Sequence, residues 1–573
     1  MDWQMKKDSI HLGYYMRKLI RSYWPLTVAI SVFVLTIAFS LMAELRQTEG
    51  RLVYALDDAY IHMAMAKNLA QHGIYGVTEY EFNSSSSSPL WTFFLTFVTS
   101  IFGVHEIIPF LLNILLGLAI LIVLHTLLRR AAVDPVIIAF VLLAIIYATP
   151  MPAMVFSGME HLFHILLTII YLWIFARIIT AERNSSLSTE YVLFFTFAAA
   201  LVLIRYESYA LLVITGLLFL LRRRWKMSAG ICLAGVLPLV TYQVISVAHG
   251  WSWLPNSVLI RTGVSNAGAG TGSGHSSILS SIISRVYGVL SNFISNLDTG
   301  LHLVALIVVS GTLLLISMNR TSSFWTLRKV MVTVFILAAL AHLMFGHIGH
   351  FFRYEAYLIA TGLFVSACII PEVTPISMPG LTGISKRMLL ILVSFLALIP
   401  LTIRIEDSLA LTPVACRNIF EQQYQMGMFL QRYYPDASVA VNDIGAVSYL
   451  THIHLLDLVG LASIEVLQLK HVGEYNTEYI QELCKKHGVR IAIVYDSWLE
   501  RIAIRENPLQ WKKVGEWRIV DNVVCSDDVV SFYAVQPSEM EKLVQNLRNY
   551  SSILPVHVKQ IGQYMENVSL IVR

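Results

Sequence analysis

Charged residues are scarce in this chain of 573 residues. They make up 14% of it, whereas soluble domains contain roughly 25%. Hydrophobic residues make up 56% and the mean hydropathy is +0.64. Apolar runs reach the roughly 20 residues that a helix needs to cross a bilayer core. An ordinary soluble protein is therefore excluded, and the composition indicates a multi-pass membrane protein.

Cysteine is scarce as well, with five residues and no CxxC pair. This pattern excludes a zinc ribbon and a dense disulfide framework, although one disulfide among Cys416, Cys484 and Cys525 stays open. The net charge of +4 is too small to indicate a nucleic-acid partner. No internal repeat points to a transporter built from duplicated halves.

Basic residues mark the cytoplasmic ends of membrane spans, because Lys and Arg are enriched in short cytoplasmic loops. The lead "KKDSIHLGYYMRKLIRSYW" is basic and has no small-residue cleavage site, so we expect a retained first helix with a cytoplasmic N-terminus. The later basic clusters at 129–130, 222–226, 328–329 and 386–387 should also be cytoplasmic.

Parity between these clusters predicts about 11 membrane crossings. The segment 89–103 is too short to span, so we expect an interfacial or re-entrant helix there. The first outer loop is then 46–88. The expected spans lie near 25–45, 107–128, 133–150 and 159–178, twice within 190–221, and near 228–248, 300–318, 330–347, 356–372 and 388–405.

The chain changes character after residue 405. Short β-branched runs in "ASVAVNDIGAVSYL", "VRIAIVYDSW" and "DDVVSFYAVQ" alternate with amphipathic stretches such as "EYIQELCKKHG". This alternation is typical of a small α/β domain. We therefore predict an α-helical polytopic membrane domain at 1–405 and an extracytoplasmic α/β accessory domain at 406–573.

Unusual polar residues gather at span ends that the topology places outside. Ionisable residues at membrane depth are costly and tend to be functional, so this gathering predicts a reaction or binding site on the outer face. The residues concerned are Asp57, Asp58, Glu81, Asn83, Glu160, His161, Arg205, Glu207, Trp253, Pro255, Asn256, Arg261, His347, His350, Arg353 and Glu355.

Several of these residues also have structural interpretations. Asp57 or Asp58 could be the N-cap of a helix that Gly73 ends, and Arg205 and Arg353 could be snorkelling residues at helix ends. Glu160 could be an ion-pair partner only. On the helix that begins at the acidic pair and ends at Gly73, we expect Lys67 and His62 on the solvated side. We expect the Ser-rich segment 83–88 to be a flexible loop.

A carboxylate and several arginines at the outer leaflet suit one chemistry in particular. A carboxylate can accept a proton from an attacking hydroxyl as a general base. Arginines bind a phosphate leaving group through charge-assisted bidentate hydrogen bonds. A lipid-linked phosphosugar presents its phosphate at this depth. The residues thus predict outer-face binding or transfer of an anionic lipid-linked substrate.

Five motifs in order resemble the GT-C superfamily of polytopic glycosyltransferases, which use polyprenyl-phosphate sugars. Within it the chain is most similar to the terminal arabinofuranosyltransferase-like group. The motifs are "DDAYIHMAMAKNLAQHGIYG" with "SSSPLWTFFL", "SGMEHLF", "LIRYESYALL", "WLPNSVLIR" and "NDIGAVSYLTHIHLLDLVGL". In the third motif Tyr206 stands where a Pro is usual, and in the fourth Arg261 stands where a Lys is common.

The resemblance implies roles for individual residues. Asp57 would be the general base and Asp58 its supporting acid or a ligand of the acceptor sugar. The implied donor-phosphate ligands are Arg205, Arg353 and Arg261, and the implied substrate-binding residues are Glu160, Asn256, Lys67 and Trp253. No cofactor is predicted, and a divalent cation stays open because some GT-C enzymes need one.

The expected activity is inverting transfer of a sugar, arabinofuranose or another pentose or hexose, from a polyprenyl-phosphate donor. The acceptor would be a glycan, lipid or protein of the cell envelope, at the outer face of the cytoplasmic membrane. The alternative is a non-catalytic carrier or partner protein for lipid-linked sugars.

Overall fold

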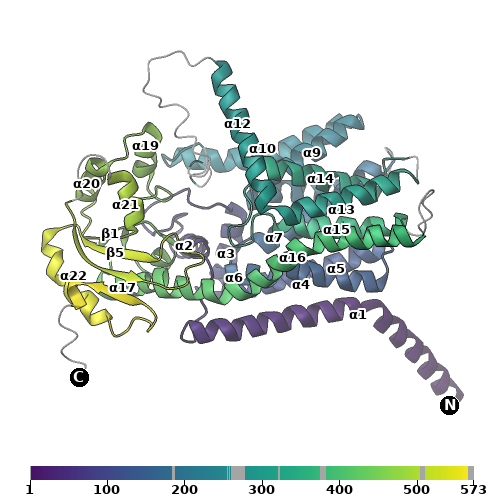
Figure 1. Ribbon diagram of the computed structural model, residues 1–573, viewed down its shortest axis with the longest axis horizontal. Helices are drawn as coiled ribbons and strands as arrows, with labels where there is room; N and C mark the ends of the chain where they lie inside the picture. Colours follow the sequence, from purple (N-terminus) through teal and green to yellow (C-terminus); the bar gives the residue numbers. More distant parts are fainter. Residues whose placement is uncertain are drawn as a thin grey trace.

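The computed structural model describes residues 2–182, 188–253, 256, 259, 278–320, 323–373, 383–503 and 510–565. A helical bundle and a C-terminal α/β domain lie end to end along its longest axis (Figure 1). This arrangement confirms the predicted fold class, a polytopic helical protein with a small C-terminal sheet domain.

Eight helical segments among the described residues are long and apolar enough to cross a membrane. Most of the expected spans are found, whereas the total of about 11 crossings stays a prediction. The bundle helices are α1 (Asp2–Gln47), α4 (Ile108–Arg130), α5 (Pro135–Ala148), α6 (Met151–Ser157), α7 (His161–Thr180), α8 (Ser188–Ile204), α9 (Ser208–Leu221), α10 (Trp225–Ala248), α12 (Ile278–Thr299), α13 (Leu301–Met318), α14 (Leu327–Phe345) and α15 (Ala356–Val373).

The predicted short helix at 89–103 is present as α3 (Pro89–Phe102). Its 14 residues are too few to cross a bilayer. The helix buries Trp91 and Leu95 and exposes Phe93 and Phe97. Although Phe93 stacks on Tyr75, half of its side chain stays exposed. An exposed apolar face of this kind is what an interfacial helix presents to lipid.

The C-terminal domain contains one mixed six-stranded sheet in the order β2-β1-β3-β5-β4-β6. β1 pairs with β2 and β3 in parallel, and the remaining pairs are antiparallel. The predicted strand segments are confirmed as β1, β3 and β5, and the predicted amphipathic segment as α20. The elements are β1 (Ser438–Val441), α18 (Gly445–Leu450), β2 (His454–Asp457), α19 (Ile464–Val472), α20 (Thr477–Lys486), β3 (Ile491–Val494), α21 (Asp496–Ala503), β4 (Lys512–Arg518), β5 (Val529–Ala534), α22 (Met540–Tyr550) and β6 (Lys559–Gly562).

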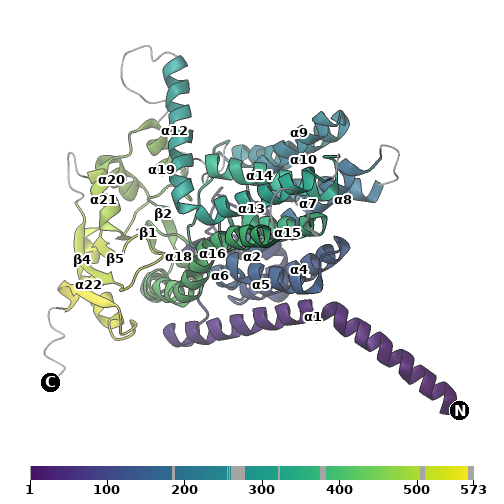
Figure 2. The same cartoon turned by 45° about the vertical axis from the view of Figure 1, so that its right-hand side comes forward.

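One continuous helical segment joins the bundle to this domain. α16 (Gly383–Ile419) passes through a π-helical turn, Phe420–Tyr424, into α17 (Gln425–Tyr433). The predicted boundary between residues 405 and 406 therefore falls inside a helix, because the pattern that marked the end of the apolar span does not mark the end of the helix. Figures 1 and 2 show the resulting arrangement, with the domain at one end of the bundle.

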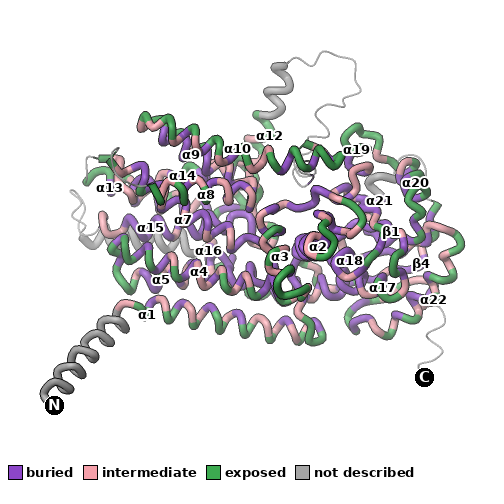
Figure 3. Tube along the Cα trace, turned by 180° about the vertical axis from the view of Figure 1, so that it is seen from behind, coloured by how far each residue is buried: buried purple, intermediate pink, exposed green. Residues whose placement is uncertain are grey.

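The acidic pair begins α2 (Asp57–His72), which lies between α3 and α18 (Figure 3). The N-cap is Leu56 and makes no side-chain capping bond, whereas Gly73 ends the helix in a left-handed conformation, as expected. The Asp57 carboxylate instead accepts the backbone N–H of Gly445 at 2.7 Å and that of Ala446 at 2.8 Å. Asp57 thus caps α18 of the C-terminal domain rather than its own helix.

Three local expectations are wrong. Lys67 and His62 are not on a solvated face but are buried, because α2 is covered by both α3 and the C-terminal domain. The Ser-rich segment 83–88 is packed rather than loose, with Ser84 bonded to Tyr242 at 3.0 Å and Ser85 to the Leu461 carbonyl at 2.9 Å. The open question of a disulfide is resolved too, since all five cysteines are free.

Gly445 is the position at which the domain contact is most sensitive to substitution. A Cβ there would lie 2.1 Å from the Asp57 carbonyl oxygen. We expect Gly445→Ala to push α18 away from α2 and to lower the free energy of unfolding by about 1–3 kcal/mol, as overpacking commonly does. Thermal unfolding of the purified protein in mild detergent measures this loss.

Gly288→Ala is the matched control, because no atom lies within 4 Å of a Cβ at this exposed position of α12. Equal stability of the two alanine variants would contradict the close contact between Asp57 and Gly445.

Candidate active site

Charged side chains converge where three connections between bundle helices meet the start of α2. Glu160 directly precedes α7, Arg205 and Glu207 lie between α8 and α9, and Arg353 lies shortly before α15. All three connections are at the end of the bundle that carries the C-terminal domain. The sequence predicted that these residues share one face, and the structure brings them into contact.

Arg353 and Asp58 form the ion pair at the edge of this cluster. An Arg353 terminal nitrogen donates to Asp58 Oδ2 at 2.7 Å, and the other contacts the sulfur of Met159. Arg353 is 1% exposed whereas the Asp58 side chain is 39% exposed. The pair therefore links a buried cation to a carboxylate that solvent or a substrate can reach.

The segment before Arg353 has an unusual backbone. His350, Phe351 and Phe352 all have positive φ angles, of 46°, 59° and 63°. Such conformations are strained for non-glycine residues and cluster at functional sites.

Glu355 and Arg404 hold this strained segment in place. Glu355 accepts the Gly349 N–H at 2.9 Å, while Arg404 donates to the Phe352 carbonyl and forms an ion pair with Glu355. Burial acts to raise the pKa of Glu355, but Arg404 and His302 outweigh it and hold that pKa well below its usual range. The loop that presents Arg353 is thus fixed by a charged Glu355.

Arg205 forms the second ion pair of the cluster, which is more deeply buried. Its guanidinium donates to Glu160 at 3.0 Å and to both Glu207 oxygens, at 3.1 and 2.6 Å. Burial acts to raise the pKa of Glu207, but Arg205 outweighs it and lowers that pKa to about 2. One Glu160 oxygen makes no hydrogen bond among the described residues.

Tyr354 joins the two arginines. The centre of its ring lies 5.4 Å from the Arg205 guanidinium carbon and 5.2 Å from that of Arg353. Cations at this distance from an aromatic ring are attracted to its face. The ring therefore brings two like charges near each other on one aromatic side chain.

His62 lies beneath the cluster, with its Nδ1 at 2.9 Å from the Thr92 hydroxyl and its Nε2 at 3.9 Å from Glu160. Burial lowers the pKa of His62, although Glu160 opposes this shift. With His62 neutral, the carboxylates of Asp58, Glu160 and Glu207 outnumber the two arginines by one. The cluster as it stands does not present an unpaired cation for an anion.

Asp57 lies next to this cluster but faces the C-terminal domain. Burial and the neighbouring Asp443 carboxylate raise the pKa of Asp57 above its ordinary range, although the two amides of α18 oppose this. Asp443 is held by Gln423 at 2.7 Å and by the Tyr495 hydroxyl. The π-helical turn that contains Gln423 thus holds the "NDIG" segment, residues 442–445, in place through Asp443.

The other predicted residues that the structure describes do not join the cluster. Lys67 donates to the Tyr449 carbonyl at 2.7 Å, and Asn256 donates to the Leu461 carbonyl at 3.0 Å, so both contact the C-terminal domain. Trp253 is exposed. Arg261 lies outside the described residues.

Sequence reasoning missed Arg404, Tyr354 and Met159 as members of the site. Arg404 lies at the outer end of the expected span near 388–405, so the argument that singled out Arg205 and Arg353 could have found it. Tyr354 and Met159 adjoin recognised residues, but the side from which they pack could not be read from the sequence. Among the described residues no group of three or more His, Cys, Asp or Glu is arranged to hold a metal ion.

Comparisons with known proteins give a likeness of fold and one domain match. ArnT from Cupriavidus metallidurans in the apo state has a TM-score of 0.46 at 13% identity and covers 89% of this chain and 99% of its own. ArnT from the same organism bound to undecaprenyl phosphate has a TM-score of 0.45 at 13% identity and covers 88% and 98%. A family described as "Domain of unknown function (DUF8728)" matches residues 417–533. No curated protein sequence matches the chain.

The lowered pKa of His62 gives a prediction about pH. In the unfolded chain this imidazole takes a proton near its ordinary pKa of 6.5, whereas in the folded protein it resists protonation. The unfolded state then binds more protons, so folding stability falls as the pH drops below about 6.5, by up to about 1.4 kcal/mol per pH unit.

His62→Gln removes this contribution and keeps a hydrogen-bonding group toward Thr92. We expect the variant to lose less stability than the parent between pH 7 and pH 5, as measured by equilibrium unfolding in detergent at several pH values. An identical pH dependence for the two proteins would show that His62 is not protonated differently in the two states.

Proposed function

We propose that the chain is a polyprenyl-phosphate-sugar-dependent glycosyltransferase of the GT-C type, acting at the outer face of the cytoplasmic membrane. The observation that carries the proposal is the ion pair between a half-exposed carboxylate, Asp58, and a buried arginine, Arg353, at the end of an apolar bundle. This one contact contains a candidate base and a candidate phosphate ligand.

The charges of the cluster suggest how an anionic donor would bind. Arg353 and Arg205 are both paired, and the site carries one more carboxylate than guanidinium groups when His62 is neutral. A donor phosphate therefore has to replace a carboxylate. Asp58 is the one to leave, because its side chain is 39% exposed whereas Glu160 is fully buried and Glu207 holds Arg205 through two contacts.

This exchange has a chemical consequence. When the phosphate takes the place of Asp58 on Arg353, the Asp58 carboxylate becomes available to accept a proton from the acceptor hydroxyl. The hydroxyl oxygen then forms a bond to the anomeric carbon while the bond from that carbon to the phosphate oxygen breaks. The lipid phosphate is the leaving group, and the arginines stabilise its negative charge. Attack from the opposite face inverts the anomeric centre.

The geometry favours Asp58 over Asp57 as the general base. Both Asp57 oxygens accept backbone N–H groups of α18, so Asp57 is occupied in holding the C-terminal domain. The resemblance implies the reverse assignment, with Asp57 as base. Structures without substrate do not exclude a candidate base on geometry alone, so Asp57 stays the second candidate.

The other implied substrate ligands take different places in this proposal. Lys67 and Asn256 position the C-terminal domain over the site through the carbonyls they contact, and Glu160 positions Arg205. Arg261 and Trp253 belong to the segment leading toward the outer loop and stay candidates for donor binding.

Transfer from a labelled polyprenyl-phosphate sugar to native membranes tests these roles. Asp58→Asn should lower turnover by about 10²–10⁴-fold, the usual contribution of a general base, without a loss of folding. Asp57→Asn should mainly lower thermal stability, because an amide can accept only one of the two N–H groups. Glu81→Gln, an acidic residue of the same outer loop outside the cluster, is the control.

An inactive Asp57→Asn protein of parental stability, together with an active Asp58→Asn protein, would make Asp57 the base. Donor binding without transfer by the parent protein, over a panel of sugars, would favour the carrier alternative.

A further inference from the structure

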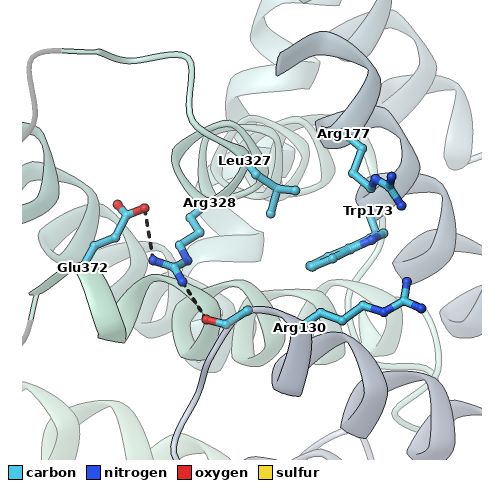
Figure 4. A pocket seen from close by; sticks show the side chains of 7 residues that line it. Arg130, Trp173, Arg177, Leu327, Arg328 and Glu372 are labelled. Carbon is cyan, nitrogen blue, oxygen red and sulfur yellow. Dashed lines mark hydrogen bonds and ion pairs between the residues drawn. The ribbon is translucent and has the colours of Figure 1, made fainter. Parts of the chain in front are cut away.

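A basic site lies at the opposite end of the bundle from Asp58. A cavity of about 680 Å³ is lined by Arg130, Ala131, Trp173, Arg177, Leu327, Arg328 and Glu372. Figure 4 shows these side chains arranged around it, from the ends of α4, α7 and α15 and the beginning of α14. Nothing in the proposed transfer reaction uses this site.

The charges of the cavity are unbalanced. Three of its lining residues are arginines and one is a carboxylate. Arg328 donates to the Ala131 carbonyl at 2.6 Å and to Glu372 at 3.4 Å, and Arg177 forms an ion pair with Glu190 at 2.7 Å. Arg130 is exposed and has no carboxylate partner among the described residues. The site thus carries a positive excess that its own residues do not neutralise.

Trp173 gives an independent indication of a ligand. The residue is 8% exposed, and its indole N–H is buried without a hydrogen-bond acceptor among the described residues. It lies between Arg177 and Arg130 (Figure 4). Buried polar groups normally have a partner, so an acceptor is missing at a place flanked by two cations.

We propose that this cavity binds a phosphate group. Guanidinium groups match phosphate oxygens in geometry and charge, and the indole N–H can donate a further hydrogen bond. Trp173 and Leu327 also give the cavity an apolar side, which suits a phosphate attached to a lipid better than a free ion. Because basic clusters mark the expected cytoplasmic side, an anionic phospholipid headgroup of that leaflet is the favoured source.

Such a ligand would join helices that are far apart in the sequence. Arg130, Arg177 and Arg328 belong to α4, α7 and α14. A phosphate bridging them would stabilise the cytoplasmic end of the bundle, in the way that any ligand of the folded state raises its stability.

Thermal unfolding of the full-length protein in a neutral detergent tests the proposal, with phosphatidylglycerol, a diacylglycerol that lacks phosphate, or inorganic phosphate added. Phosphatidylglycerol should raise the unfolding temperature, and its apparent affinity should fall roughly tenfold or more in Arg130→Gln/Arg177→Gln, which removes two charge-assisted contacts. The single variant Arg130→Gln, at an exposed position, provides the test if the double variant does not fold.

Arg222→Gln is the matched control, because Arg222 lies at the same end of the bundle and packs on Trp325 outside the cavity. An effect of phosphatidylglycerol that inorganic phosphate does not reproduce identifies a lipid headgroup, and a response to inorganic phosphate alone identifies a soluble phosphate ligand. Both support a phosphate site. No response to either anion, an equal response to the diacylglycerol, or an equal loss in Arg222→Gln would overturn it.

Discussion

The arrangement of this protein depends on one contact. The Asp57 carboxylate accepts hydrogen bonds from the backbone amides of Gly445 and Ala446. It joins the first loop after α1 to the C-terminal domain, and it does so only because Gly445 has no side chain to keep the two backbones apart. α2 is thereby enclosed between α3 and α18, and Asp58 is fixed one residue away, facing Arg353. The accessory domain is thus part of the site rather than an appendage to it.

Burial explains why so many charges at this end are paired. An isolated ion in a low-dielectric region is costly, and removing one partner of a buried pair leaves the other uncompensated. Arg205 with Glu160 and Glu207, and Arg404 with Glu355, satisfy this condition within the protein. In the Asp58–Arg353 pair the carboxylate is more exposed, at 39% against 28% for Glu207. For this reason the proposed exchange with a donor phosphate would take place at Asp58.

Much of this organisation could be predicted from the sequence. Hydrophobic length and basic clusters placed most bundle helices, and alternating β-branched runs placed β1, β3 and β5. The convergence of Asp58, Glu160, Arg205 and Arg353 followed from the expectation that their loops share one face. Such arguments depend only on local pattern and charge, which the bilayer makes unusually informative.

The errors have a common physical origin, which is contact with segments that a local sequence pattern does not reveal. The pattern of α2 predicts a surface helix with Lys67 and His62 in solvent. The Ser-rich composition of 83–88 predicts a flexible loop. Lys67 and Ser85 contact α18 and the loop near Leu461, almost 400 residues away along the chain. His62 and Ser84 instead contact Thr92 of α3 and Tyr242 of α10. The contact between domains also occupies both oxygens of Asp57, and a carboxylate pattern in the sequence does not reveal which backbone amides will reach it.

The central claim is that a lipid phosphate exchanges with Asp58 on Arg353, and a structure with the ligand bound tests it most directly. The protein would be imaged by electron cryomicroscopy in lipid nanodiscs with a polyprenyl phosphate at saturating concentration. We expect the phosphate within hydrogen-bonding distance of Arg353, with Asp58 separated from that guanidinium. A phosphate bound elsewhere, with the Asp58–Arg353 pair intact, would contradict the account.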